Sequence, residues 1–282
     1  MRSDVVHLDR KVKLFSTHSV NILVTSARCP MAPKLKRNII YGVAVVACLC
    51  LSTLSTFASS HVLLKPDIAR AHREELITRL RVITGLTNLD FDSDGALSFD
   101  VNQASGGSAS ARELLSQAVN GANVIVLEDA SSRSDVAFCR VVRGRWTRAE
   151  SNRPPAYVVL IDFTDFQQLS GDAEARAAFD VGWGLLHEID HVVSGSEDAK
   201  NEKGIGECED HINAMRREVG LPVRTEYFFT RAYLKADANF NTRYVRLSFE
   251  RRDVSQTKRY WLVWDAVSVG GLIGDSQRAL VR

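Results

Sequence analysis

The chain has 282 residues, of which 25% are charged and 45% hydrophobic, and its formal net charge is +2. This composition is typical of a globular protein and excludes a disordered tail, a collagen-like fibre or a coiled coil. The charge is unevenly spread: residues 1–58 hold eight Lys/Arg and two Asp/Glu, whereas residues 59–282 hold 28 and 32. Because the larger part is slightly acidic, we expect no nucleic-acid partner.

The N-terminal segment has the pattern of an export signal. Residues 34–58 begin with three basic side chains and continue as an apolar run broken only by small hydroxyl residues. That order is typical of a secretory signal peptide, and the run is close to the roughly 20 residues that span a bilayer. Whether the segment is cleaved or retained as a membrane anchor at residues 38–58, its charges predict an extracytoplasmic location.

This pattern divides the chain into two parts, a leader at residues 1–58 and a single domain at residues 59–282. Within the leader, Met31 is a second start candidate, so residues 1–30 are either an incorrectly assigned start or a short cytoplasmic tail. Two other interpretations of the leader are open. The residues before Cys48 resemble a lipoprotein cleavage box, and the apolar run alone would also suit a buried core helix.

The domain begins with a predicted helix and a predicted hairpin. Residues 66–85 have apolar positions at helical spacing and end at a glycine. Residues 89–101 alternate apolar and polar side chains on both sides of Asp94-Gly95, which predicts a β-hairpin. The same acidic residues resemble the start of a calcium loop, but Val101 stands where that loop requires a bidentate Glu.

The later elements mix helices and strands without a regular alternation. Helices are predicted over residues 106–121, 172–194 and 205–220. Strands rich in β-branched and aromatic residues are predicted at NVIVLED, VAFCRVVRG, PAYVVLIDF, RYVRLSFE and KRYWLVWDAVSV. This order favours the α+β class.

The strongest chemical signal is HEIDH, residues 187–191, inside the helix predicted over residues 172–194. Residues four apart share a helical face, so the imidazoles of His187 and His191 can bind one cation. Neutral imidazole is a good Zn²⁺ ligand, and catalytic zinc sites use three protein ligands and a water. Glu188 would accept a proton from that water and pass it to the leaving amine. The alternative is a pair of surface histidines beside a solvated Glu.

A third metal ligand is expected from the helix predicted over residues 205–220, whose candidates are Glu207, Glu209, Asp210 and His211. We prefer Glu209, because it shares a helical face with Asn213 and an arginine that could orient the ligands. Glu207 is the second choice, since it lies four residues before His211. Alternatively, these acidic side chains only compensate the dipole at the start of the helix.

Together these motifs resemble the zinc metallopeptidases of the NleD-type effector group and related domains of polymorphic bacterial toxins. The resemblance is carried by HEIDH, by N-x-x-R-R-E-x-G-L-P-x-R from Asn213 to Arg224, and by GS-x-x-A-R-x-L-L from Gly107 to Leu115. It covers about residues 105–230. It implies a zincin-like fold, in which a small mixed sheet accompanies the HExxH helix and a second helix that carries a ligand. It also implies one zinc ion, peptide-bond hydrolysis, two histidine ligands and a Glu base.

Other residues near the motif have open assignments. A group that stabilises the developing oxyanion could come from Tyr227, Tyr233, Arg224 or Arg231, whose aromatic neighbourhoods also suit plain core packing. The strand PAYVVLIDF is either an edge strand along which a peptide is paired or a central strand. Trp183 is expected to pack the helix that carries HEIDH.

Two cysteines, Cys139 and Cys208, lie outside the leader. They form a disulfide, as export would allow, or remain buried thiols. Cys208 is also adjacent in sequence to Glu209, where it could affect a bound metal.

We therefore predict an exported zinc metallopeptidase that acts on a protein or peptide and has a membrane tether if the leader is retained. One alternative is a zinc amide hydrolase acting on cell-wall peptide. Another is a non-catalytic exported domain whose metal is structural and is closed by four protein ligands, for which Cys208 and His211 are extra candidates.

Overall fold

The computed structural model describes residues 61–131, 133–144, 154–201, 204–231 and 244–269. All of these segments belong to one compact unit, Ser59–Arg282. The predicted leader lies outside the described residues, and so does the anchor predicted at residues 38–58. In the segments that are described, no helix is both long enough and apolar enough to cross a membrane.

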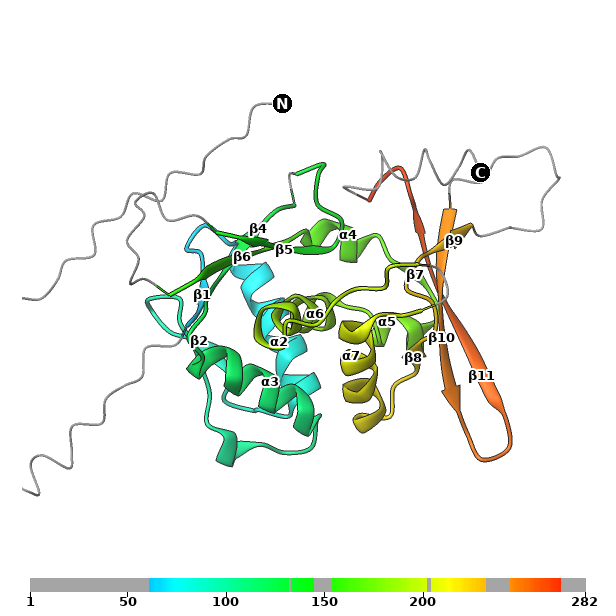
Figure 1. Ribbon diagram of the computed structural model, residues 1–282, viewed down its shortest axis with the longest axis horizontal. Coiled ribbons are helices and arrows are strands. Elements are labelled where there is room, and N and C mark those ends of the chain that lie inside the picture. The colour runs from blue at the N-terminus through cyan, green and yellow to red at the C-terminus, as the bar shows by residue number, and fades with distance from the viewer. Residues whose placement is uncertain (1–60, 132, 145–153, 202–203, 232–243, 270–282) are drawn as a thin grey trace, which may run out of the picture. The chain divides into compact units, whose positions relative to one another are not determined.

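A four-stranded sheet forms one layer of the molecule (Figure 1). Its strand order is β1 (Val62–Leu64), β4 (Val124–Asp129), β6 (Ala156–Ile161) and β5 (Cys139–Arg143). The first three strands are parallel, and β5 runs antiparallel to β6 with Cys139 opposite Ile161. Among the described strands β5 is therefore at the edge, and β6, for which the sequence left both positions open, is central.

The described helices lie mostly on one side of this sheet (Figure 1). They are α2 (Arg70–Thr84), α3 (Ala109–Asn120), α4 (Phe163–Gln167), α5 (Ala173–Ala177), α6 (Val181–Val193) and α7 (Glu207–Glu218), with a 3₁₀ turn, η1 (Val101–Gln103). Helix α6 contacts α2, α3, α7, β5 and β6. It buries Leu185, Leu186 and Ile189 completely in the main core, which explains its largely apolar sequence.

The helix predicted over residues 172–194 is wrong in its continuity, because the structure divides it into α5 and α6. The break is at Asp180, whose carboxylate accepts hydrogen bonds from the backbone N–H of Gly182 (2.9 Å) and Trp183 (3.2 Å). An N-cap of this kind replaces the helical hydrogen bonds that the first turn of a helix lacks. The apolar spacing continues across the break, so periodicity alone did not reveal it.

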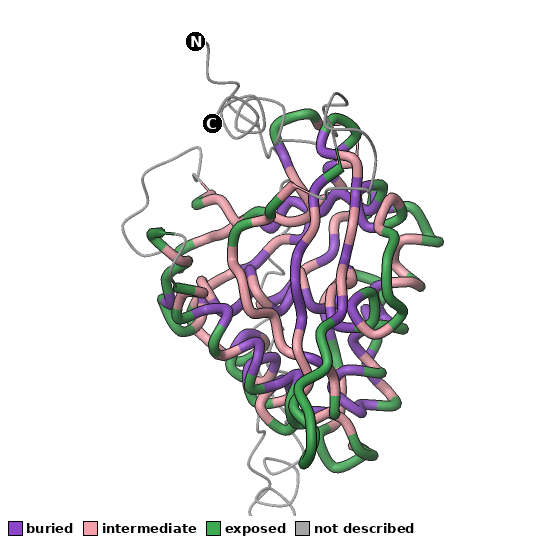
Figure 2. The backbone as a smooth tube through the Cα atoms, turned by 90° about the vertical axis from the view of Figure 1, so that its right-hand side faces the viewer, coloured by how far each residue is buried: buried purple, intermediate pink, exposed green. Residues whose placement is uncertain are grey.

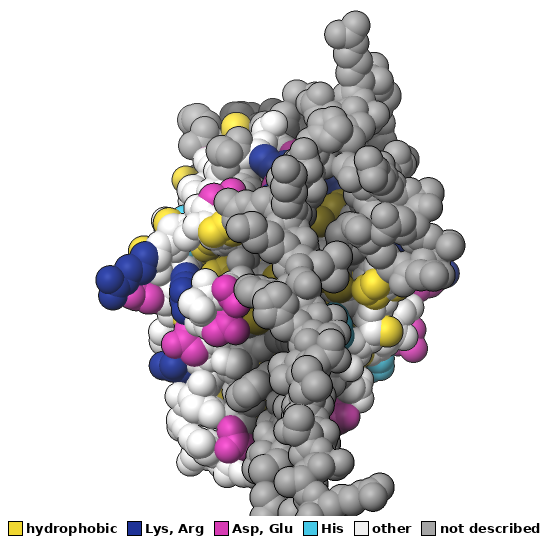
Figure 3. Space-filling view, turned by 90° about the vertical axis from the view of Figure 1, so that its left-hand side faces the viewer, with side chains coloured by type: hydrophobic (Ala, Val, Ile, Leu, Met, Phe, Trp, Pro, Cys, Tyr) yellow, Lys and Arg dark blue, Asp and Glu magenta, His cyan; other side chains and the backbone are white. Residues whose placement is uncertain are grey.

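The predicted hairpin at residues 89–101 is confirmed as β2 (Asp90–Phe91) paired with β3 (Leu97–Ser98). The Asp92 carboxylate accepts hydrogen bonds from two backbone N–H groups of the turn, those of Asp94 and Ala96. The acidic side chain therefore supports a turn, as the hairpin interpretation predicted. On the face drawn in Figure 3, Lys and Arg side chains lie close to Asp and Glu side chains. Helix α2 carries one ion pair of this kind, Arg70–Glu74.

A second sheet carries its own small core. It is built on the long hairpin of β10 (Tyr244–Arg252) and β11 (Thr257–Asp265), with the short strands β7 (Ser170–Gly171), β8 (Val223–Arg224) and β9 (Thr230–Arg231) added. Phe249 and Trp264 are buried on one face, and residues 252–259 at the far end are exposed (Figure 2). Small sheets and irregularly placed helices together make a mixed α/β fold, in agreement with the predicted α+β class.

Candidate metal centre

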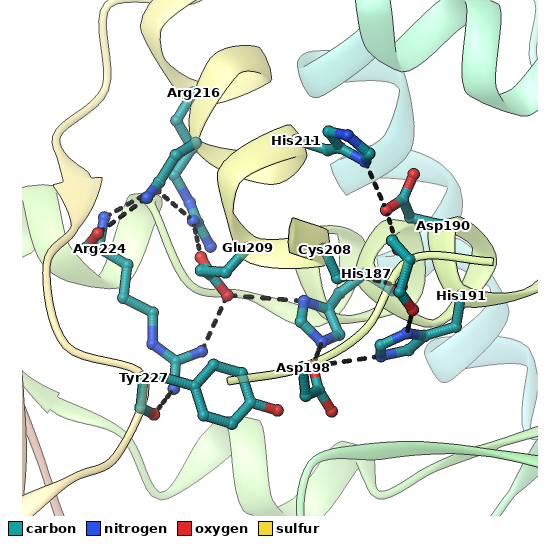
Figure 4. Close-up of polar contacts among 12 residues, drawn as sticks. His187, Asp190, His191, Asp198, Cys208, Glu209, His211, Arg216, Arg224 and Tyr227 are labelled. Carbon is teal, nitrogen blue, oxygen red and sulfur yellow. Dashed lines mark hydrogen bonds and ion pairs between the residues drawn. The ribbon is translucent and has the colours of Figure 1, made fainter. Parts of the chain in front are cut away.

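Helix α6 presents His187 and His191 on one face, as the spacing predicted. Their rings lie 4.8 Å apart, nearly perpendicular to each other. Both Nε2 atoms face one carboxylate oxygen, Oδ1 of Asp198, at 3.0 Å from His187 and 3.3 Å from His191 (Figure 4). Asp198 lies on the loop that follows α6. Two imidazole nitrogens and one carboxylate oxygen therefore converge on a single point, which is a donor set that suits zinc.

A fourth group lies beside these three. The Sγ of Cys208, from the first turn of α7, is 3.3 Å from the backbone oxygen of His187. One ligand atom from each of His187, His191, Asp198 and Cys208 can be chosen so that all four lie within 4.8 Å of one another. Cys208 is fully buried, and both it and Cys139 are free thiols, so the disulfide that the sequence left open is not formed.

The other ring nitrogens of the two histidines are held from outside the point of convergence. His191 Nδ1 donates to the backbone oxygen of Ser196 at 2.8 Å. His187 Nδ1 lies 3.5 Å from Oε2 of Glu209. Metal-binding histidines usually have their second nitrogen bound to a carbonyl or carboxylate, which fixes both ring orientation and tautomer. Glu209 therefore lies on the side of the His187 ring opposite to Asp198.

Glu209 is buried between two arginines. Its carboxylate contacts Arg216 through one oxygen and lies 3.0 Å from Nη1 of Arg224 through the other. Burial opposes ionisation, but the two guanidinium charges outweigh it and hold the pKa of Glu209 well below its usual range. Both oxygens of Glu209 are thus bound by arginine. Oε2, the oxygen that contacts Arg224, is also the one that faces Nδ1 of His187.

The charge balance of the cluster favours an anionic Asp198 and protonated histidines when no metal is bound. Burial opposes ionisation of Asp198, but hydrogen bonds from both histidines hold its pKa well below the usual range. Conversely, the bond to Asp198 raises the pKa of His191 to about 11. Metal binding requires neutral imidazole, so a metal would displace these protons.

Glu188 points toward the edge strand of the first sheet. One of its carboxylate oxygens, Oε2, accepts a hydrogen bond of 2.7 Å from the backbone N–H of Val141 on β5. Glu188 is 8% exposed, and this burial raises the pKa of its carboxyl group despite the neighbouring histidine charges. The carboxylate thus lies between the sheet edge and the histidine pair.

The loop that carries Asp198 is fixed by Asp190, the fourth residue of HEIDH. This buried carboxylate accepts hydrogen bonds from the hydroxyls of Ser194 and Ser196 and lies 2.9 Å from Nδ1 of His211. His211, one of the alternative ligands, is therefore engaged away from the point of convergence. Glu207 and Asp210 are also not among the four residues that converge there.

Asp198 was not singled out from the sequence. It lies in the polar stretch SGSEDAKNEKG, where an acidic residue has no periodic pattern that would predict its direction. In the structure, a β-bridge to Gly206 holds residue 198 against the start of α7. The only signal in the sequence that pointed to Asp198 was its place in the short loop that connects the HExxH helix to the second helix.

The remaining predicted residues have clear positions, except Tyr233, which lies outside the described residues. The ring of Tyr227 stacks near that of His187 at 6.3 Å, and its hydroxyl points toward Asp198 (Figure 4). Arg224 is engaged by Glu209, and Arg231 lies in β9. Trp183 is buried and donates through Nε1 to a backbone oxygen of α5, which confirms its predicted packing role.

Comparisons with known proteins add no family assignment. The chain matches no protein-family model, no curated protein and no solved structure.

Proposed function

We propose that the protein is a zinc-dependent metallopeptidase of zincin-like fold, in which His187, His191 and Asp198 hold the metal and Glu188 is the general base. The observation that carries this proposal is the convergence of two imidazole nitrogens and one carboxylate oxygen beside a buried Glu. Two histidines and a carboxylate are an established ligand set of catalytic zinc. In this proposal Asp198 takes the role predicted for Glu209, and Glu209 orients the His187 ring.

Zinc bound by these residues would supply Lewis acidity and activate a water molecule. Glu188 supplies the proton transfer. Its burial raises its pKa above the usual value of a glutamate, which favours proton uptake by this carboxylate. The Val141 N–H holds one oxygen of this carboxylate and fixes its direction. Tyr227, whose ring stacks near His187 and whose hydroxyl points toward Asp198, is one of the predicted groups that could stabilise an oxyanion.

The peptide substrate is assigned to the edge of β5. An edge strand has backbone groups that can pair with an extended peptide, and such pairing does not depend on side-chain sequence. The bond between Val141 and Glu188 joins this edge directly to the proposed base. In this proposal the peptide therefore pairs with Cys139–Arg143 and not with the central strand formed by PAYVVLIDF.

Substitution of the base tests this proposal. The full-length protein should bind about one zinc ion per chain, and Glu188→Gln should keep the zinc while cleavage of a peptide library falls roughly 10²–10⁴-fold. Glu113→Gln, an exposed substitution on α3, is the matched control and should cleave normally. A folded protein without metal, or a Glu188→Gln variant that cleaves like wild type, would contradict the proposal.

A second candidate function is a structural metal site, because Cys208 supplies a fourth ligand atom. Four protein ligands would close the coordination shell and leave no position for water. Replacement of zinc by cobalt separates the two cases, since a bound thiolate gives an intense sulfur-to-cobalt absorption band. If that band is present, is lost in Cys208→Ser, and no peptide is cleaved, the closed structural site is the correct interpretation.

A further inference from the structure

A cavity of about 500 Å³ opens beside the proposed metal centre. Such a volume falls within the usual range of ligand pockets, about 300–1,000 Å³. Its walls are largely aromatic, and they come from the start of β5, the α5–α6 junction and the segment after β8: Phe138, Phe179, Trp183, Phe228 and Phe229. His187 and Glu188 also line it. The cavity therefore begins at the groups to which the proposed function assigns the chemistry.

Three charged side chains that line the cavity, Glu209, Arg216 and Arg224, are already paired with one another. Glu209 is held by Arg216 and Arg224, as described above. Arg216 also donates to the backbone oxygen of Ala178, and its guanidinium lies 5.3 Å from the ring centre of Trp183. Arg224 donates to two backbone oxygens, and its guanidinium lies 4.8 Å from the ring centre of Tyr227. These donors are used internally, so the surface offered to a ligand is mainly aromatic.

We infer that this cavity receives a large apolar or aromatic side chain of the substrate, next to the scissile bond. The inference rests on the proposed function and names its substrate class: peptides with a bulky apolar residue at the cleavage site. Because His187 and Glu188 border both the cavity and the metal centre, a side chain in the cavity belongs to a residue adjacent to the bond that Glu188 serves. Transfer of a Phe side chain from water into such a cavity favours Phe over Ala on the order of ten- to a hundredfold in kcat/KM.

Charged substrate side chains are disfavoured in the same place. An acidic side chain would meet arginines that are already bonded to Glu209, and a basic one would be repelled by the same two guanidinium groups, Arg216 and Arg224. Either would lose its hydration without gaining a free partner. The expected order of preference is therefore aromatic and large aliphatic side chains first, Ala next, and Asp or Lys last.

The test is a set of short blocked peptides that differ only at the two residues beside the scissile bond, cleaved by the full-length zinc-loaded protein. A digest of proteome-derived peptides first locates the bond, and the matched set then carries Phe, Leu, Ala, Asp or Lys on either side. We expect Phe or Leu on one side to raise kcat/KM at least about tenfold over Ala. Equal rates for all peptides, or a preference for a charged residue, would overturn the inference.

A binding measurement distinguishes failure of the cavity from failure of the proposed hydrolysis. Glu188→Gln protein loaded with zinc is titrated calorimetrically with a blocked peptide that carries Phe or Ala at its centre. If no peptide is ever cleaved but the Phe peptide binds at least about tenfold more tightly, the cavity assignment stands and the hydrolase proposal falls. If all peptides are cleaved equally and bind equally, the hydrolase proposal stands and the cavity assignment falls.

Two variants of the cavity wall connect the preference to its residues. Phe228 is 42% exposed, so Phe228→Ala should keep the fold and lower the ratio of kcat/KM between the Phe and Ala peptides. Ala137→Leu, which narrows the cavity from the β5 side, should lower the same ratio. Because the ratio is measured within one protein, a partly unfolded sample does not alter it. Val101→Ala, on the exposed η1 turn, is the control and should leave this ratio of kcat/KM unchanged. An unchanged ratio in both cavity variants would refute the assignment.

Discussion

Two carboxylates flank His187, and their surroundings give them different roles. The side chain of Asp198 is 44% exposed. Its carboxylate faces Nε2 of His187 and also Nε2 of His191. Glu209 is 1% exposed, faces Nδ1 and is neutralised by two arginines. Two guanidinium groups already neutralise the negative charge of Glu209, so this carboxylate attracts a further cation only weakly. The charge of Asp198 is balanced only by the protons of the two histidines, which a metal would displace.

Removal of Asp198 and removal of Glu209 should therefore weaken zinc binding to different extents. Asp198→Ala removes a proposed ligand and should weaken zinc binding by more than about 100-fold, whereas Glu209→Gln should weaken it about 10–100-fold through the orientation of His187. Competition titration with a zinc chelator measures both. Glu197→Ala removes the neighbouring exposed acid and is the control for charge alone. A larger loss in Glu209→Gln than in Asp198→Ala would restore Glu209 as the ligand.

A second residue-scale prediction concerns Asp129, at the end of β4 and far from HEIDH in sequence. Its carboxylate lies 2.7 Å from His72 Nδ1 and accepts the backbone N–H of Ser131 at 2.9 Å. Burial opposes ionisation, but these hydrogen bonds outweigh it and lower the pKa of Asp129. Because the folded pKa is below the unfolded value, this stabilisation is present above about pH 4 and is lost as the pH falls through the folded pKa.

Asp129→Asn should accordingly lower the free energy of unfolding by about 1 kcal/mol near neutral pH, and the difference should shrink on acidification. Urea denaturation at several pH values between about 7 and 3 measures this dependence. Asp135→Asn, at an exposed ion pair with Arg133, is the control and should change stability by less than about 0.5 kcal/mol. A pH-independent effect of Asp129→Asn would exclude ionisation as its cause.

At the scale of elements, the proposed metal centre depends on how the loop between α6 and α7 is held at both ends. The Asp190 carboxylate fixes its beginning through Ser194 and Ser196. Its end is fixed at Gly206, which has a φ of +83° and forms a bridge with Asp198. A Cβ atom at Gly206 would lie 2.4 Å from the backbone nitrogen of residue 199, so only glycine fits without displacement of the loop.

Gly206→Ala should therefore displace Asp198 and weaken zinc binding, and it should also lower stability by more than about 1 kcal/mol because of the positive φ. Gly204→Ala is a closely matched control, since a Cβ atom there meets nothing within 4 Å. Zinc titration and thermal unfolding of the two variants compare the effects. Equal zinc affinity in both would show that the loop does not position a ligand.

At the scale of the whole described unit, two hydrophobic cores meet at Phe138. Its ring contacts Phe166 and Phe179 at centre distances of 5.3 and 5.2 Å, and Trp264 of the second sheet at 5.5 Å. Phe138 has a φ of +59°, which is unusual for a large residue, and Asp165 holds its backbone N–H. The junction thus joins the sheet of β5 to the sheet of β10 and β11.

Phe138→Ala should lower the free energy of unfolding by about 3 kcal/mol, because removal of the ring leaves an empty space between the two cores. Wild type should unfold in urea as one transition, with tryptophan fluorescence and far-ultraviolet circular dichroism coincident. Phe228→Ala, partly exposed, is the control for loss of an aromatic ring and should cost far less. Separate transitions in the wild type would show that the two cores are not coupled.

The sequence by itself determined the features that depend on local geometry. The positions of α2, α3, α7 and the main strands follow from periodicity, capping residues and β-branched composition, which act within a few residues. His187 and His191 share a face for the same reason, since four residues make about one helical turn. The break at Asp180 was missed because the apolar pattern continues through a cap whose effect depends on a single side chain.

Only the tertiary structure decided which groups surround the two histidines. Asp198 reaches them because a loop closes between Asp190 and Gly206, and the direction of a loop side chain is set by such long-range contacts rather than by its neighbours in sequence. The aromatic cavity and the position of Cys139–Arg143 at the sheet edge likewise arise from segments distant in sequence. Spacing along the chain could place His187 and His191 on one helix face, but Asp198, the proposed third ligand, and the cavity required the chain to fold back on itself.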